Sequence, residues 1–221
     1  MIVKMLTLGA LNTNCYVIQD EKSEEAVVID PAFSTETEGK RTVLRLIQTG
    51  NLSVRFIVNT HGHADHTCGN GVVKKATGAL ILIHELDAPL LGVSGQEWAS
   101  LFGIRLASPP ADKTLHDGDK IAIGETTLTV LHTPGHTPGG ISLAAENSVF
   151  VGDTLFKGSI GRVDFPGGSY EQMIKSIKEK LATLPDNLMV YPGHGPATTI
   201  GEEKRNNPYL LFPETYVQDR E

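Results

Sequence analysis

The chain has 221 residues and a formal net charge of −7, with 40% apolar and 20% charged residues. This acidic balance lacks the basic excess with which proteins bind a phosphate backbone. No uninterrupted apolar run approaches the roughly 18–20 residues that span a bilayer. We therefore expect a single globular domain over residues 1–221, with neither a nucleic-acid nor a membrane partner.

The chain contains two cysteines, Cys15 and Cys68. Two thiols without a Cys-x-x-Cys pair form no disulfide framework, which favours a reducing, cytoplasmic location. Cys68 lies close to the histidine-rich segment described below. We interpret it as a small buried residue and not as a metal ligand, because free cysteines are usually buried.

The first half of the chain is expected to alternate strands with helices. Short runs rich in Ile, Val and Leu predict strands at residues 2–8, 14–19, 26–30, 56–58 and 80–83. Between the third and the fourth run, Ser34 or Thr35 can cap a helix that ends at Gly50. A second helix is predicted from Asp65 to Thr77, and a short one from His84 to Leu91.

The second half begins with residues 92–118, which lack periodicity and predict a long loop with some helical content, of a length that often serves as a lid. Two hairpins are expected next, pairing residues 119–123 with 126–131 and residues 141–145 with 148–151. Ser169 begins a helix that Pro185 stops. Residues 188–191 predict a last strand, and the charged run before Pro208 is expected to be a solvated surface helix.

Four potential metal ligands lie within six residues, directly after the predicted strand 56–58. They are His61, His63, Asp65 and His66. A packed core has little reason to hold three imidazoles and a carboxylate at this density, whereas metal sites use such groups. The ends of strands are also where α/β proteins tend to place their chemistry.

Three further ligand-type residues follow predicted strands and have glycine neighbours, namely His136, Asp153 and His194. Seven ligands exceed the three or four that a single tetrahedral zinc takes. Two ions that share one carboxylate account for the number, and such pairs of ions lie roughly 3.5–4 Å apart. His84, His116 and His132 show no comparable convergence, and we interpret them as structural.

The order of these motifs, from Thr60-His-x-His-x-Asp-His66 to the Gly-His136, Gly-Asp153 and Gly-His194 pairs, resembles the metallo-β-lactamase fold superfamily across nearly the whole chain. The resemblance implies an α/β (α+β) fold, an αβ/βα sandwich of two mixed sheets flanked by helices. It also implies that one metal is held by His61, His63 and His136, and the other by Asp65, His66 and His194. Asp153 would bridge the two ions.

Within the superfamily, the segments Gly152–Phe156, Gly158–Arg162 and Asn207–Tyr209 resemble those of the glyoxalase II-like hydrolases, which cleave thioesters of glutathione. Arg162 matches a residue that binds the glutathione moiety in that family. The chain ends soon after Tyr209, so no separate C-terminal helical substrate domain is expected. The resemblance implies a small-molecule thioester of the hydroxyacylglutathione type as the substrate.

Several relatives with the same metal motif carry out other reactions. A β-lactamase is disfavoured, because two-zinc enzymes of that kind usually have Cys in place of Asp153. The tRNA 3′-end nucleases need an RNA-gripping extension that this acidic chain lacks. A mononuclear iron persulfide dioxygenase remains an alternative, with iron at His61, His136 and Asp153. A non-catalytic metal-binding module is a further alternative.

The expected mechanism is attack of a metal-bridging hydroxide on the thioester carbonyl. Asp65 and Asp153 are the candidate catalytic residues, since Asp65 could steer the hydroxide as well as bind a metal. Zinc is the expected metal, although iron and manganese suit the same ligands. Asp30, Thr60 and Thr154 are candidates to fix the imidazole tautomers.

Overall fold

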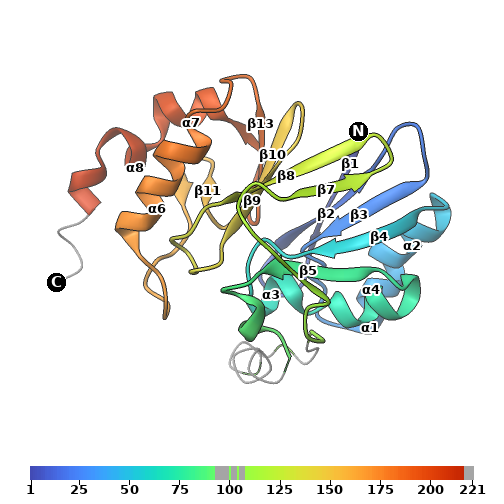
Figure 1. Ribbon diagram of the computed structural model, residues 1–221. Helices are drawn as coiled ribbons and strands as arrows, with labels where there is room; N and C mark the ends of the chain where they lie inside the picture. The colour runs from blue at the N-terminus through green and yellow to red at the C-terminus, as the bar shows by residue number, and fades with distance from the viewer. Residues whose placement is uncertain (93–99, 101–103, 105–107, 217–221) are drawn as a thin grey trace.

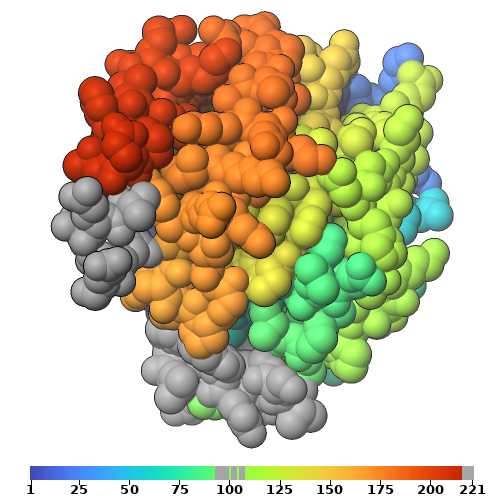
Figure 2. Space-filling view, turned by 60° about the vertical axis from the view of Figure 1, so that its left-hand side comes forward, coloured from blue at the N-terminus to red at the C-terminus, as the bar shows by residue number. Residues whose placement is uncertain are grey.

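Two six-stranded sheets lie face to face, with helices on both outer faces (Figure 1). The computed structural model describes residues 1–92, 100, 104 and 108–216. In the space-filling view, the orange and red C-terminal third of the chain covers one side of the molecule (Figure 2). The αβ/βα sandwich expected from the sequence is confirmed.

The first sheet is formed by the N-terminal half of the chain. Its strands, in spatial order, are β1 (Ile2–Leu8), β2 (Thr13–Gln19), β3 (Glu25–Ile29), β4 (Ser53–Val58), β5 (Leu80–His84) and β6 (Lys113–Leu115). The pairs β1–β2 and β2–β3 are antiparallel, whereas β3 to β6 run parallel to one another. The parallel strands place their carboxyl ends at one edge of the sandwich, where the loop after β4 carries the histidine-rich segment.

The second sheet contains both predicted hairpins. Its strands, in spatial order, are β14 (Thr198–Thr199), β13 (Met189–Pro192), β10 (Ser148–Gly152), β9 (Ile141–Ala144), β8 (Thr126–His132) and β7 (Lys120–Ile123). Only β10 and β13 are parallel neighbours. A separate two-stranded ribbon, β11 (Leu155–Phe156) with β12 (Ser159–Ile160), follows directly after β10.

The helices of the two halves cover opposite outer faces (Figure 1). On the first sheet lie α1 (Glu36–Arg41), α2 (Val43–Thr49), α3 (Ala64–Thr67), α4 (Asn70–Thr77) and the 3-10 turn η1 (Ala88–Leu90). On the second lie α6 (Tyr170–Ser176), the π-helical turn η2 (Ile177–Leu181), α7 (Ile200–Asn206), α8 (Pro208–Leu211) and the 3-10 turn η3 (Pro213–Tyr216). No helix in the described part of the chain has the length and apolar character needed to cross a bilayer.

The side chains of each strand point alternately to the other sheet and to the outer helices, and this explains how the layers pack. In β2, Tyr16 and Ile18 face the second sheet, whereas Cys15 and Val17 face the helices of the first half, and all four are at most 2% exposed. Successive strand residues point to opposite faces, so a strand buried on both sides must be apolar throughout. Burial of each large apolar side chain contributes about 1.5–3 kcal/mol to stability.

Most predicted strands and both hairpins are confirmed, but two helix predictions are wrong in their continuity. The helix from Asp65 to Thr77 is split into α3 and α4, because the amide of Gly69 donates to the carbonyl of Pro31 at 2.7 Å, outside the helix. The helix ending at Gly50 is likewise divided at Thr42 into α1 and α2.

Other predictions differ at element ends. The expected helix from His84 to Leu91 is reduced to η1, since His84 still belongs to β5. Ser169 caps α6 as predicted, its Oγ accepting the amide of Gln172 at 3.3 Å. Strands β6, β11, β12 and β14 were not predicted. Of the predicted loop at 92–118, residues 93–99, 101–103 and 105–107 lie outside the described residues.

The charged run before Pro208 forms a helix that breaks where expected, but it is not simply a solvated surface helix. Glu203, in α7, is 2% exposed. Its carboxylate accepts the amide of Gly158, the hydroxyl of Thr198 and the side-chain amide of Asn207, at 2.6–2.8 Å. These hydrogen bonds tie the turn between β11 and β12 to the C-terminal helices, and this correction bears on the site because Phe156 lies in β11.

Candidate metal centre

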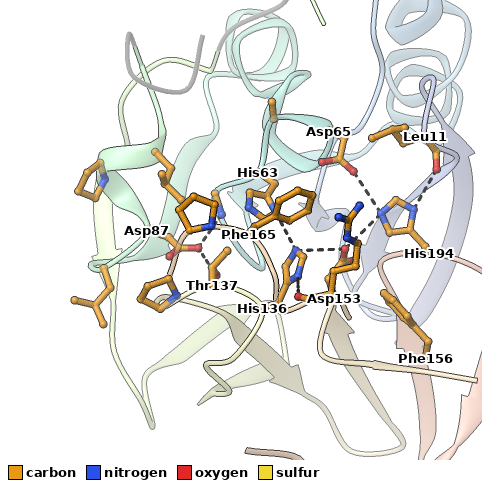
Figure 3. A pocket seen from close by; sticks show the side chains of 18 residues that line it. Leu11, His63, Asp65, Asp87, His136, Thr137, Asp153, Phe156, Phe165 and His194 are labelled. Carbon is orange, nitrogen blue, oxygen red and sulfur yellow. Dashed lines mark hydrogen bonds and ion pairs between the residues drawn. The ribbon is translucent and has the colours of Figure 1, made fainter. Parts of the chain in front are cut away.

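All seven ligand-type residues meet at one edge of the sandwich, beyond the carboxyl ends of strands. Figure 3 shows five of them, His63, Asp65, His136, Asp153 and His194. The loop after β4 carries His61 and His63, and α3 carries Asp65 and His66. The other three, His136, Asp153 and His194, follow β8, β10 and β13. Strands far apart in sequence therefore deliver their ends to a single cluster.

The first group consists of His61, His63 and His136. The Nε2 atom of His61 lies 3.1 Å from Nδ1 of His63, and that atom lies 2.8 Å from Nε2 of His136. One nitrogen of each ring thus points to a common point. Three converging imidazole nitrogens form a ligand set that suits zinc and other transition metals.

The second group consists of Asp65, His66 and His194. The Nε2 atoms of the two histidines are 3.3 Å apart, and each lies 3.3–3.4 Å from Oδ2 of Asp65. The hydroxyl of Thr13, in β2, donates to the same carboxylate oxygen at 2.9 Å. This group offers two nitrogens and one oxygen to a second ion.

Asp153 lies between the two groups. Its Oδ1 is 3.4 Å from Nε2 of His66, and its Oδ2 is 3.6 Å from Nε2 of His136 and 3.5 Å from Nε2 of His194. Within the described residues, Oδ1 is buried and has no hydrogen-bond partner. A buried acceptor of this kind is costly unless a proton or a cation meets it, so the donor set fits two divalent ions that share this carboxylate.

Three histidines have a fixed tautomer, because their Nδ1 atom faces a pure acceptor. Nδ1 of His66 lies 3.0 Å from Oδ2 of Asp30. Nδ1 of His136 and of His194 donate to the backbone carbonyls of Arg162 at 2.6 Å and of Leu11 at 3.2 Å. In the neutral form of each ring the lone pair is consequently on Nε2, the atom that faces the cluster, which is the usual arrangement of metal-ligating histidines.

His61 is oriented through a relay. The hydroxyl of Thr60 donates to Oδ2 of Asp30 at 2.7 Å, so its oxygen is left to accept from Nδ1 of His61 at 3.1 Å. The two contacts confirm that Asp30 and Thr60 support the imidazoles, as predicted. Thr154 instead contacts the hydroxyl of Thr133 at 3.3 Å.

The pKa values of His61 and His63, in the first group, shift in the opposite direction from that of His66, in the second group. Burial and the neighbouring imidazoles lower the pKa of His61 well below 6.5 and that of His63 to about 3. Burial alone would lower the pKa of His66 as well, but Asp65, Asp153 and Asp30 raise it to about 10. His61 and His63 therefore offer unprotonated nitrogens at neutral pH, whereas an ion at the second group must displace a proton from His66.

Close packing at Gly193 limits what can precede His194. A Cβ atom at this position would lie 2.1 Å from Oδ1 of Asp153 and 2.7 Å from Cε1 of His66. The backbone here also exchanges hydrogen bonds with neighbouring segments, the amide of Gly193 with Gly152 and its carbonyl with Asn14. Only glycine allows this approach of backbone to ligands.

Asp87 joins the two loops that carry the first group, and sequence reasoning missed it. Its buried carboxylate accepts the amide of Gly62 at 2.9 Å, the hydroxyl of Thr137 at 2.7 Å and the amide of Gly139 at 2.7 Å. These bonds fix the loop of His61 and His63 relative to the loop of His136. A lone aspartate after a strand gives no sequence signal for such a contact.

A pocket of about 460 Å³ opens onto the cluster (Figure 3). His63, Asp65, His136, Asp153 and His194 form its floor. Arg162 lines it, as the prediction of a substrate-binding role requires, but its guanidinium already donates to Asp164 at 2.6–2.9 Å. Whether Arg162 contacts a substrate stays a prediction.

Several residues outside the ligand cluster were also interpreted from the sequence. Cys68 is buried, with its Sγ 3.2 Å from the carbonyl of Phe33, as expected of a structural residue. His84, His116 and His132, for which no convergence was expected, do lie together in a separate cluster, in which the rings of His84 and His132 stack at 4.2 Å. The carbonyls of Leu11 and Arg162 were missed, because no side chain marks a carbonyl that supports a ligand.

Comparison with known proteins is consistent with this geometry. Residues 8–194 match the model of the metallo-beta-lactamase superfamily. The chain is 36% identical to the hydroxyacylglutathione hydrolase GloC of Haemophilus influenzae, over 95% of this chain and 98% of GloC. The crystal structure of the BLEG-1 B3 metallo-beta-lactamase is similar with a TM-score of 0.85 and 33% identity, over 95% of this chain and 99% of BLEG-1. That of ETHE1 from Myxococcus xanthus has a TM-score of 0.79 and 32% identity, over 95% and 84%.

Proposed function

Because the chain belongs to the metallo-beta-lactamase superfamily, we propose that it is a two-metal hydrolase that cleaves small-molecule thioesters, the reaction class of hydroxyacylglutathione hydrolases. One observation carries the proposal. The two oxygens of Asp153 lie 3.4–3.6 Å from nitrogens of both ligand groups, the position of a carboxylate that two ions share. The similarity to GloC supports the choice of thioesters.

Bound divalent ions supply a hydroxide at neutral pH and Lewis-acid polarisation of a carbonyl. The chain's own residues hold and orient the reacting groups. Thr13 donates to Oδ2 of Asp65 and leaves the other carboxylate oxygen to orient the nucleophile. A thiol leaving group has a pKa of about 8.5, so it departs as thiolate without a strong general acid. A thioester therefore suits this site, because the polar residues on the floor of the pocket are histidines and aspartates of the kind that bind metals.

Zinc is the metal we propose for both positions, since His and carboxylate ligands with nitrogen in the majority suit it, and iron or manganese would suit the same atoms. A cytoplasmic location belongs to the same proposal. Both thiols, Cys15 and Cys68, are buried and unpaired, which agrees with a reducing compartment.

The test combines metal analysis with turnover. The purified protein is loaded with zinc, its metal content is measured by mass spectrometry, and hydrolysis of S-lactoylglutathione and of neutral thioesters is followed by thiol release. We expect about two zinc ions per chain and thioester turnover. Full metal loading with no turnover of any thioester would indicate a metal-binding module and not a hydrolase. Faster hydrolysis of a β-lactam than of any thioester would indicate that the substrate is a β-lactam.

A mononuclear iron persulfide dioxygenase is the second candidate, because the similarity to ETHE1 fits it. In that case His61, His136 and Asp153 would hold one iron and leave positions open for oxygen. Loading with iron and measuring oxygen uptake on glutathione persulfide separates the two reactions. One iron per chain with oxygen uptake, and no thioester turnover by the zinc form, would favour the dioxygenase.

A further inference from the structure

The walls of the pocket differ in character from its floor. Among the described residues, the lining residues other than the metal-ligand types are mainly aliphatic, aromatic or proline, and we call them the walls; they include Leu11, Leu86, Pro89, Leu90, Phe156 and Phe165. We propose that these walls bind an apolar acyl chain, and that the preferred substrate is a thioester with a long, uncharged acyl group and not a small hydroxyacyl glutathione. This inference rests on the proposed thioester hydrolysis.

The apolar walls come from several parts of the fold. Leu11 lies in the turn between β1 and β2, and Leu86 and Leu90 lie near η1. Phe156 in β11 lies beside His194, with ring centroids 6.2 Å apart, whereas Phe165 lies beside His63 at 5.6 Å (Figure 3). Leu11 is 47% exposed and Leu86 53% exposed. Large apolar side chains that line a concave pocket beside polar groups are typical of ligand sites, and a volume of 460 Å³ is within their usual range.

The charges at the pocket do not match glutathione. Glutathione carries carboxylates at both of its ends, which need cations or backbone donors when they leave water. Arg162 is the only lysine or arginine among the described lining residues. Its guanidinium forms a two-pronged pair with Asp164 and lies 4.3 Å from the ring centroid of Phe165. The net charge of −7 adds long-range repulsion of an anionic ligand.

The expected size of the preference for a long acyl chain follows from the apolar surface that the chain removes from water. Each methylene group removed from water contributes about a fourfold gain in affinity. An octanoyl chain that contacts these apolar lining residues should therefore gain at least tenfold over a short, polar acyl group, even if only part of it is buried. A small hydroxyacyl group would leave most of these walls in contact with water.

Kinetics with four thioesters tests the proposal. Lactoyl and octanoyl groups are each attached to glutathione and to neutral N-acetylcysteamine, and kcat/KM is measured with the zinc-loaded protein. We expect at least a tenfold preference for octanoyl over lactoyl with either thiol, and no preference for glutathione. Equal rates for the two acyl groups, or a tenfold preference for lactoylglutathione, would overturn the proposal.

A matched pair of variants tests whether the preference for a long acyl chain arises at the wall of the pocket. Leu86 lines the pocket, whereas Leu211 in α8 is 44% exposed and lies outside the lining. Leu86→Ser should lower kcat/KM for octanoyl-N-acetylcysteamine about three- to tenfold, a larger factor than for the lactoyl thioester. Leu211→Ser should change neither. Equal effects of Leu86→Ser on both acyl groups would contradict binding of the chain at this wall.

A binding assay separates failure of this inference from failure of the proposed function. The neutral fluorophore N-phenyl-1-naphthylamine is titrated into wild type and both variants, and then displaced with a non-hydrolysable octyl thioether of N-acetylcysteamine. Weaker binding to Leu86→Ser alone, without turnover of any thioester, would overturn the hydrolase and support the apolar pocket. Thioester turnover without binding of fluorophore or thioether would overturn the apolar pocket and support the hydrolase.

Discussion

Nδ1 of His66 lies 3.0 Å from Oδ2 of Asp30, and both side chains are at most 1% exposed. The same carboxylate accepts the amide of Thr60 at 2.8 Å and its hydroxyl at 2.7 Å. Asp30 thus orients His66 directly and His61 through Thr60. A single buried carboxylate supports one histidine of each ligand group.

We expect Asp30→Asn to lower metal affinity about 10- to 100-fold, the usual effect of removing a partner that supports a ligand. The amide keeps the shape, and asparagine tolerates the positive φ of 48° at this position. However, it cannot accept all three donors. Competition with a chelator measures the affinity. Asp186→Asn, at an exposed surface aspartate, is the control, and an unchanged affinity in Asp30→Asn would show that the support is dispensable.

Asp153→Ala should lose at least one metal ion per chain and nearly all thioester hydrolysis, since its two oxygens face both groups. Metal content by mass spectrometry and thiol release measure the two effects. Thermal unfolding followed by circular dichroism checks that the variant folds, with Asp186→Ala as a surface control. Retained activity together with full metal content would refute the bridging assignment.

The metal ligands could be predicted from the sequence, because they are recognised by the type of their side chain and by their position directly after apolar strands. His61, His63, Asp65 and His66 could be proposed from spacing alone. The contacts that orient His136 and His194 could not, because these two rings bind backbone carbonyls, which every residue possesses. Their positions depend on how distant loops meet after folding.

Similar limits explain the errors in the fold. The apolar periodicity of α4 continues smoothly from the histidine-rich segment, so nothing in it reveals that Gly69 bonds to Pro31 and breaks the helix. The charged run containing Glu203 has the composition of a solvated surface. Its burial arises because the turn at Gly158 brings an amide to the carboxylate, a tertiary contact without a local signal.

Two adjacent glutamates of α7 should therefore respond differently to alanine. Glu203→Ala leaves the buried hydroxyl of Thr198 without its acceptor and removes one acceptor each from Asn207 and Gly158, and we expect it to lower the free energy of unfolding by about 3 kcal/mol. Glu202 contacts exposed side chains, so Glu202→Ala should change it by less than about 0.5 kcal/mol. Urea denaturation measures both, and equal effects would contradict a structural role for Glu203.

Asp87→Ala should weaken metal binding as well as stability. It leaves the amides of Gly62 and Gly139 and the hydroxyl of Thr137 without their acceptor, a loss of about 3 kcal/mol or more. The loops of His61 and His136 would then separate more easily. Chelator competition and urea denaturation are compared with Glu85→Ala, an exposed neighbour. Stability loss with unchanged metal affinity would mean that Asp87 supports the fold alone.

The last prediction concerns acid stability and the cluster of His84 and His132, away from the metal ligands. Burial, and then the stacked ring of His132, hold the pKa of His84 below 6.5, and the nearby carboxylates of Asp87 and Glu85 only partly offset this. Its Nδ1 also accepts the amide of Leu86 at 3.3 Å, which requires an unprotonated ring nitrogen. The unfolded state thus binds the proton more readily than the folded state.

Stability should accordingly decrease as the pH falls from about 6.5 toward the lowered pKa of His84, and be fully present above that range. His84→Phe keeps an aromatic ring beside His132 but removes the titration, so its loss of unfolding free energy between pH 7.5 and 5.5 should be smaller than that of wild type. Urea denaturation of the metal-free protein in chelator measures this difference. His116→Phe, at an exposed ring of the same cluster, is the control. An identical decrease in wild type and His84→Phe would exclude His84 as a source of acid sensitivity.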